Sequence, residues 1–175
     1  MQQDSTPQQS KFHHAFRIIY NDGIVKELVT DVSVKFPAKE DIRKYKAVWD
    51  TGATHTAITP KVVSDLQLQP IDVAKVYVVD SEEPKTVDVY LVDIILPNRV
   101  RIPNIHATCS PIQDCDVLIG MNIIQLGDFN ISKKFDGHKY MTMFSFCIPS
   151  HSNPVDLLEK SEMVNLRNQK KRNRT

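Results

Sequence analysis

Asp50 is the residue of this sequence best placed to do chemistry, because a short apolar run precedes it and a turn of small and hydroxyl-bearing residues follows. The stretch over residues 48–54 reads Val-Trp-Asp-Thr-Gly-Ala-Thr. Asp is unfavourable inside strands, whereas Gly permits sharp bends and close backbone approach. We therefore expect a strand over residues 46–49, after a charged loop over 41–46, to hold the Asp50 carboxylate at a tight, partly dry turn. Carboxylates in such places acquire shifted pKa values and can do chemistry.

A second signal lies at residues 116–120, which read Asp-Val-Leu-Ile-Gly and end 70 positions after Asp50. A continuous apolar run that ends in Gly predicts a strand buried on both faces. Residues 121–126 then predict a short helix, with Gly127 at its end. Another short helix is expected after Thr59-Pro60, since Thr favours the N-cap and Pro the first helical position.

The pattern Asp-x-Gly-x-Thr at residues 50–54 also matches the first phosphate loop of actin-like ATPases. Those proteins need two nucleotide-binding lobes, a much longer chain and a second glycine-rich phosphate loop. This chain has 175 residues and only 5 Gly. The phosphate-binding interpretation is therefore disfavoured.

Taken together, the Asp50 turn and the strand that ends at Gly120 resemble the retropepsin-like aspartic proteases, over roughly residues 48–127. The resemblance implies a mainly β fold, a closed acid-protease-type barrel with one or two short helices and one lobe per chain. It also implies an aspartic endopeptidase that acts on a peptide or protein substrate without a cofactor. The rival interpretation is a non-catalytic peptide-binding or dimerisation module with the same fold.

The same resemblance implies roles for the residues of the turn. Asp50 would be the catalytic carboxylate. Thr51 would bond across to its symmetry mate, and the backbone of Gly52 would donate a hydrogen bond to the carboxylate.

Four further residues would support this site. Ala53 would keep the tip of the turn narrow, and the Thr54 hydroxyl would hold the outer carboxylate oxygen. Ile119 and Gly120 would form the crossing strand that supports the turn from below.

The chain contains a single Asp-Thr/Ser-Gly triplet. One carboxylate cannot act as acid and base in the same step, so the resemblance implies a homodimer with the active site on its two-fold axis. Such isologous dimers are the commonest oligomers.

Two departures from the family stand out. A hairpin over residues 76–88 would be the flap that covers bound peptide, but its tip is acidic rather than glycine-rich. The flap residues expected to cover substrate are Val79, Asp80, Ser81, Glu82 and Glu83. The second departure is the bulky Trp49, which strand alternation turns away from Asp50 and into the core.

Three segments are expected: residues 1–11 disordered, 12–150 the protease-like domain, and 151–175 a short helix followed by a basic disordered tail. Within the domain, residues 12–20 and 24–36 alternate like strands, and Asn21-Asp22-Gly23 between them predicts a hairpin turn. A second hairpin is expected around Asp136-Gly137.

Composition and charge exclude several function classes. The net charge of +1 argues against a globally basic nucleic-acid binder. No apolar run is long enough to cross a bilayer and no signal peptide is evident, so we expect no membrane partner and a cytoplasmic location. The three cysteines are too few for a disulfide framework. His106 lies near Cys109 and Cys115, but their spacing matches no zinc pattern, and no metal site is expected.

Overall fold

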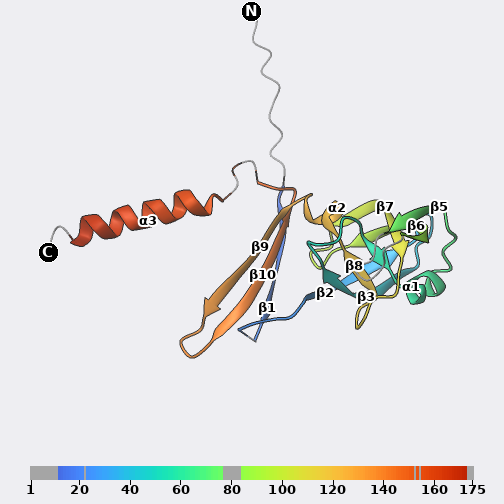
Figure 1. Cartoon of the computed structure of the whole chain (residues 1–175), viewed down its shortest axis with the longest axis horizontal. Coiled ribbons are helices and arrows are strands. Elements are labelled where there is room, and N and C mark those ends of the chain that lie inside the picture. Colours follow the sequence, from blue (N-terminus) through green and yellow to red (C-terminus); the bar gives the residue numbers. More distant parts are fainter. Residues whose placement is uncertain (1–11, 22, 77–83, 152, 154, 173–175) are drawn as a thin grey trace, which may run out of the picture.

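Six strands close into a barrel in the computed structural model, which describes residues 12–172 except 22, 77–83, 152 and 154 (Figure 1). The strands follow one another in the order β2, β3, β8, β4, β7, β6, and β6 pairs back onto β2 through residues 93–95 and 33–35. Their bounds are β2 Leu28–Lys35, β3 Ile42–Trp49, β8 Val117–Ile119, β4 Ala57–Ile58, β7 Arg101–Cys109 and β6 Lys85–Ile95. A further strand, β5 (Asp72–Val76), extends the sheet beside β6. The predicted closed, mainly β barrel is confirmed.

A separate antiparallel sheet stands beside the barrel in Figure 1 and has the strand order β1, β10, β9. Its strands are β1 His14–Tyr20, β9 Asp128–Phe135 and β10 Tyr140–Ile148. The β9–β10 hairpin was predicted, but the hairpin around Asn21-Asp22-Gly23 is wrong. Strand β1 pairs with β10 along its whole length, and β2 pairs with β3 and β6. Burial of the Phe16 face of β1 against β10 outweighs the local turn preference.

The approach to Asp50 is longer than expected, because β3 begins at Ile42 and includes the charged segment that we predicted as a loop. Charged and apolar positions alternate over residues 44–47. Lys44 and Lys46 are exposed on one face, while Tyr45, Ala47 and Trp49 are buried on the other, and the exposed Arg43 lies near the start of the strand. A strand with one solvated face tolerates charges on that face.

Three helices complete the described residues: α1 (Pro60–Asp65), α2 (Met121–Ile124) and α3 (Leu157–Arg172). Helices α1 and α2 lie where they were predicted. Helix α3 is longer than expected, since it includes most of the basic segment that we predicted as a disordered tail. It has no buried residue. Its sequence contains no Gly or Pro and is rich in good helix formers.

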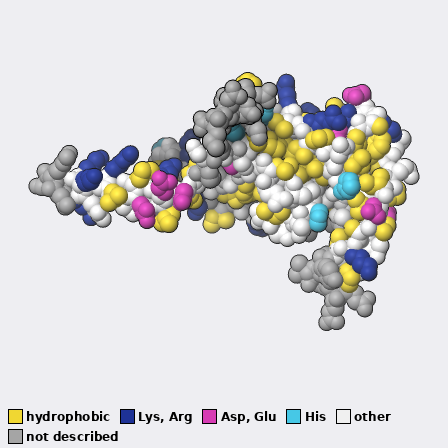
Figure 2. Space-filling view, turned by 90° about the horizontal axis from the view of Figure 1, so that it is seen from above, with side chains coloured by type: hydrophobic (Ala, Val, Ile, Leu, Met, Phe, Trp, Pro, Cys, Tyr) yellow, Lys and Arg dark blue, Asp and Glu magenta, His cyan; other side chains and the backbone are white. Residues whose placement is uncertain are grey.

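Helix α3 projects away from both sheets (Figure 1), and basic side chains gather near its free end (Figure 2). Lys170, Lys171 and Arg172 occupy its last turn. Cations there are favoured by the helix dipole. None of the helices that the structure describes combines the length and apolar character needed to cross a bilayer.

Trp49 joins the three-stranded sheet to the barrel. It lies on β3 and is only 5% exposed, as predicted for a core residue. Its ring lies near four Phe rings of the other sheet, at centroid distances of 5.9, 6.1, 5.2 and 4.9 Å from Phe16, Phe129, Phe144 and Phe146. Its indole N–H donates to the buried hydroxyl of Thr30 at 2.9 Å. This aromatic cluster fixes how the two sheets pack.

We expect Trp49→Ala to lower the free energy of unfolding by about 3–5 kcal/mol, because it leaves a cavity in the aromatic cluster. Phe135→Ala is a matched control, since that ring is 55% exposed at the far end of β9. It should cost much less. Urea unfolding followed by circular dichroism at one fixed protein concentration measures both changes, because Trp49 is the only Trp and its fluorescence is lost with it. Equal costs for the two variants would contradict this role of Trp49.

Candidate active site

Asp50 lies directly after β3, on a turn held to the end of β8. Its backbone N–H donates to the carbonyl oxygen of Ile119 at 3.0 Å. The backbone N–H of Gly52 donates to the Asp50 carboxylate oxygen Oδ1 at 2.8 Å. The carboxylate is therefore fixed both through its own backbone and through a donor two residues later, and it remains half-buried.

The turn and the β8 segment cross each other in close contact. The backbone N–H of Met121 donates to the carbonyl of Ala53 at 2.8 Å, and that of Asn122 donates to the carbonyl of Thr54 at 3.1 Å. Strands β3 and β8 run parallel just before this crossing, with Trp49 opposite Ile119. Residues 50–54 and 119–122 thus form one hydrogen-bonded unit, although they are distant in sequence.

Gly120 is required at the crossing because there is no room for a side chain. A Cβ atom at this position would lie 2.6 Å from both the carbonyl carbon and the carbonyl oxygen of His55. Those atoms belong to the backbone and cannot move aside as a flexible side chain would. Any other residue at position 120 would push the Asp50 turn away from β8.

One of the expected contacts takes a different form, and another stays a prediction. The Thr51 side chain is exposed and forms no hydrogen bond with another described residue of its own chain, so its expected bond to a second chain stays a prediction. The Thr54 hydroxyl makes none with Asp50 among the described residues, and Thr54 contributes its backbone carbonyl instead. The flap residues Val79, Asp80, Ser81, Glu82 and Glu83 lie outside the described residues.

Thr56 and Asn122 are two supporting residues that the sequence did not reveal to us. The hydroxyl of Thr56 is fully buried and donates to the side-chain carbonyl of Asn122 at 2.9 Å. The backbone N–H of Gly120 also points to this hydroxyl, at 3.4 Å. A buried hydroxyl needs such partners, because leaving it unpaired is costly. The clue in the sequence was a third hydroxyl-bearing residue, Thr56, just beyond Thr51 and Thr54.

A cavity of about 460 Å³ opens beside Asp50 and Thr51. Apolar side chains from both sheets line much of it, and Lys26, Glu27 and Gln113 add polar groups. The apolar lining comprises Leu28, Val48, Trp49, Ile112, Leu118, Phe129 and Ile131. A carboxylate next to a cavity with mostly apolar walls is suited to proton transfer with a bound molecule. No His or Cys is among the lining residues.

Comparison with known proteins gives three findings. Residues 39–125 match the model of the family described as "gag-polyprotein putative aspartyl protease". No curated protein matches the chain. Among solved structures, the chain is similar to the crystal structure of a retropepsin-like aspartic protease from Rickettsia conorii, with 14% sequence identity and a TM-score of 0.47, over 78% of this chain and 96% of that one.

The matched segment begins just before β3 and ends just after α2, so it contains both halves of the crossing at Gly120. The family match therefore covers the part of the chain in which the Asp50 turn is built. With the closed barrel around that turn, it leads to one conclusion. Residues 39–125, which hold the Asp50 turn and the strand that supports it, belong to the retropepsin-like aspartyl protease family.

Proposed function

We propose that this protein is an aspartic endopeptidase, in which two chains form a homodimer and pair their Asp50 carboxylates around one water molecule. The observation that carries the proposal is the held carboxylate. Asp50 accepts a hydrogen bond from Gly52 and faces a cavity, on a turn tied by its backbone to β8.

The proposed chemistry follows from placing two carboxylates side by side. Two like charges in contact cannot both ionise readily, so the pair shares one proton and titrates as a unit. The ionised carboxylate takes a proton from the water, which attacks the carbonyl carbon of the peptide bond. The protonated carboxylate donates to the carbonyl oxygen and later helps to protonate the leaving nitrogen. The backbone N–H of Gly52 keeps the carboxylate oriented throughout.

Surface features around the turn support the homodimer. Thr51 is exposed next to Asp50 and is free to bond to the same residue of a second chain. Ile131 lines the cavity from β9 and is 53% exposed, which is unfavourable for a large apolar side chain in water. A second chain that covers this face would bring the two turns together and bury Ile131.

We expect Asp50→Asn to abolish cleavage of a random peptide library assayed from roughly pH 4 to 7, because an amide can neither take a proton from the water nor pass one to the leaving nitrogen. The substitution keeps the size of the side chain and an oxygen that can accept from Gly52. Asp31→Asn is the matched control, because Asp31 is exposed and its one ion-pair partner among the described residues is Lys46 on the surface. It should retain activity. Mass spectrometry of the products gives the readout.

Two results would contradict the enzyme. Identical product patterns from the wild type and Asp50→Asn would assign the cleavage to a contaminant or to another site. No cleavage by the wild type at any pH would favour the rival function, a peptide-binding or dimerisation module that keeps the fold without turnover.

The shared site predicts a dominant effect of the inactive variant. When wild type is mixed with increasing amounts of Asp50→Asn and allowed to exchange subunits, activity should fall with the square of the wild-type fraction, because only wild-type pairs hold two carboxylates. Sedimentation of each protein alone should show a dimer. Activity that merely follows the amount of wild type, or a tight monomer at the assay concentration, would contradict a site on the two-fold axis.

A further inference from the structure

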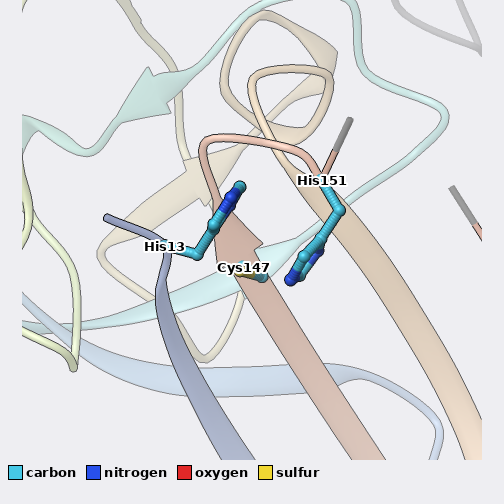
Figure 3. A group of neighbouring side chains, drawn as sticks. All are labelled: His13, Cys147 and His151. Carbon is cyan, nitrogen blue, oxygen red and sulfur yellow. The ribbon is translucent and has the colours of Figure 1, made fainter. Parts of the chain in front are cut away.

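Three side chains that commonly bind metal ions meet at one end of the three-stranded sheet (Figure 3). His13 immediately precedes β1, Cys147 is the penultimate residue of β10, and His151 follows shortly after β10. One ligand atom of each lies within 4.8 Å of the ligand atoms of the other two. The sulfur is buried, whereas both imidazole rings are exposed. None of the three lines the cavity beside Asp50.

Hydrogen bonds orient both imidazole rings. Nδ1 of His13 lies 3.0 Å from the carbonyl oxygen of Pro149, and Nδ1 of His151 is bonded to the carboxylate of Asp128. A carbonyl and an ionised carboxylate only accept, so in each ring the Nδ1 atom carries the hydrogen. In the neutral rings the Nε2 lone pairs therefore remain available. Metal-binding histidines show this arrangement, in which a carboxylate or carbonyl accepts from the other ring nitrogen.

Asp128 ties a third strand to the cluster. It is the first residue of β9, and its carboxylate also accepts from the backbone N–H of His151 at 3.0 Å. The segment after β10 is thereby held next to the start of β1. A pair of unrelated surface histidines would not require this support.

We propose that His13, Cys147 and His151 bind a zinc-type divalent ion through two imidazole nitrogens and one thiolate, with water in the fourth position. Zinc accepts this mixture of nitrogen and sulfur ligands in tetrahedral geometry. Asp128 is then the residue that positions His151. This site lies outside the proposed proteolytic chemistry and does not depend on it.

The cluster needs only a modest change to close around an ion. Zinc bonds of about 2.0 Å to nitrogen and 2.3 Å to sulfur place tetrahedral ligand atoms roughly 3.5 Å apart, so the 4.8 Å span contracts by about 1 Å. The two imidazole rings are stacked, with their centroids 4.4 Å apart and an angle of 6° between their planes. The lone pairs, which lie in the ring planes, are therefore nearly parallel. The rings must tilt toward a common point, and their exposure leaves space for this rotation.

A bound ion is expected to hold one end of the three-stranded sheet together. The ion would link the residue before β1 to the end of β10, and through Asp128 to the start of β9. Because it would bind the folded chain and not the unfolded one, it should raise the free energy of unfolding by an amount that grows with the logarithm of its free concentration above Kd.

The test uses the full chain without a histidine tag, stripped with EDTA and kept reduced with a phosphine. Titration with Co²⁺ should saturate at one equivalent per chain and produce a thiolate-to-cobalt charge-transfer absorption, which Zn²⁺ then displaces. Zn²⁺ should also raise the thermal unfolding midpoint. Less than one equivalent bound, or no charge-transfer band, would overturn the proposal.

Paired variants assign the ligands. His13→Gln and His151→Gln should each weaken binding at least about tenfold, since even partners of metal ligands have effects of this size. His14→Gln, at the exposed neighbouring position, should leave binding unchanged. Cys147→Ser should abolish the charge-transfer band, whereas Cys109→Ser should keep it. If Cys147→Ser does not fold, the exposed histidine variants still decide the matter. A His14→Gln loss equal to that of His13→Gln, or a band that survives Cys147→Ser, would refute the site.

Discussion

The structure around Asp50 depends on a backbone crossing that leaves no room for a side chain. At Gly120 the chain passes so close to the backbone of His55 that a single methyl group would collide with it. On either side of that point, hydrogen bonds run from Asp50 to Ile119 and from Met121 to Ala53. A carboxylate on a short turn would otherwise sample many orientations. Here its backbone is fixed by a strand from a distant part of the sequence, so the turn is already ordered in the folded chain.

The aromatic cluster extends this constraint beyond the barrel. Trp49 precedes Asp50, and its ring packs among the Phe rings of β1, β9 and β10. Trp49, the barrel residue that packs against the three-stranded sheet, is thus the direct neighbour of Asp50 in the sequence. Strand alternation sends the two side chains to opposite sides, so Trp49 packs in the core while the Asp50 carboxylate stays on the turn. The position of the Asp50 turn therefore depends on the packing of both the barrel and the three-stranded sheet.

Sequence reasoning succeeded where local chemistry decides the structure. The small and hydroxyl-bearing turn, the apolar strand β8 and the Thr59-Pro60 helix start all depend on neighbouring residues. Strand β8 is fully buried on one face only, since Leu118 on the other face is half-buried beside the cavity. Sequence reasoning failed where segments distant in sequence compete to pair with the same strand. Asn21-Asp22-Gly23 is a good hairpin turn, yet β1 gains more by pairing with β10 and burying Phe16 there. The bond from Thr56 to Asn122 spans 66 positions, and the contact between His13 and His151 spans 138. No local pattern shows which distant residue will be the partner.

The parallel pairing of β3 with β8 also has a consequence for how the molecule is made. Parallel neighbours cannot be joined by a tight turn, and here the chain travels through β4, α1, β5, β6 and β7 before β8 returns to lie beside β3. Closing so long a loop is entropically costly and slow compared with forming hairpins. A growing polypeptide that has reached only the end of β7 already contains Asp50 but lacks the strand that holds it. The order of synthesis thus keeps the carboxylate turn unassembled until most of the barrel exists.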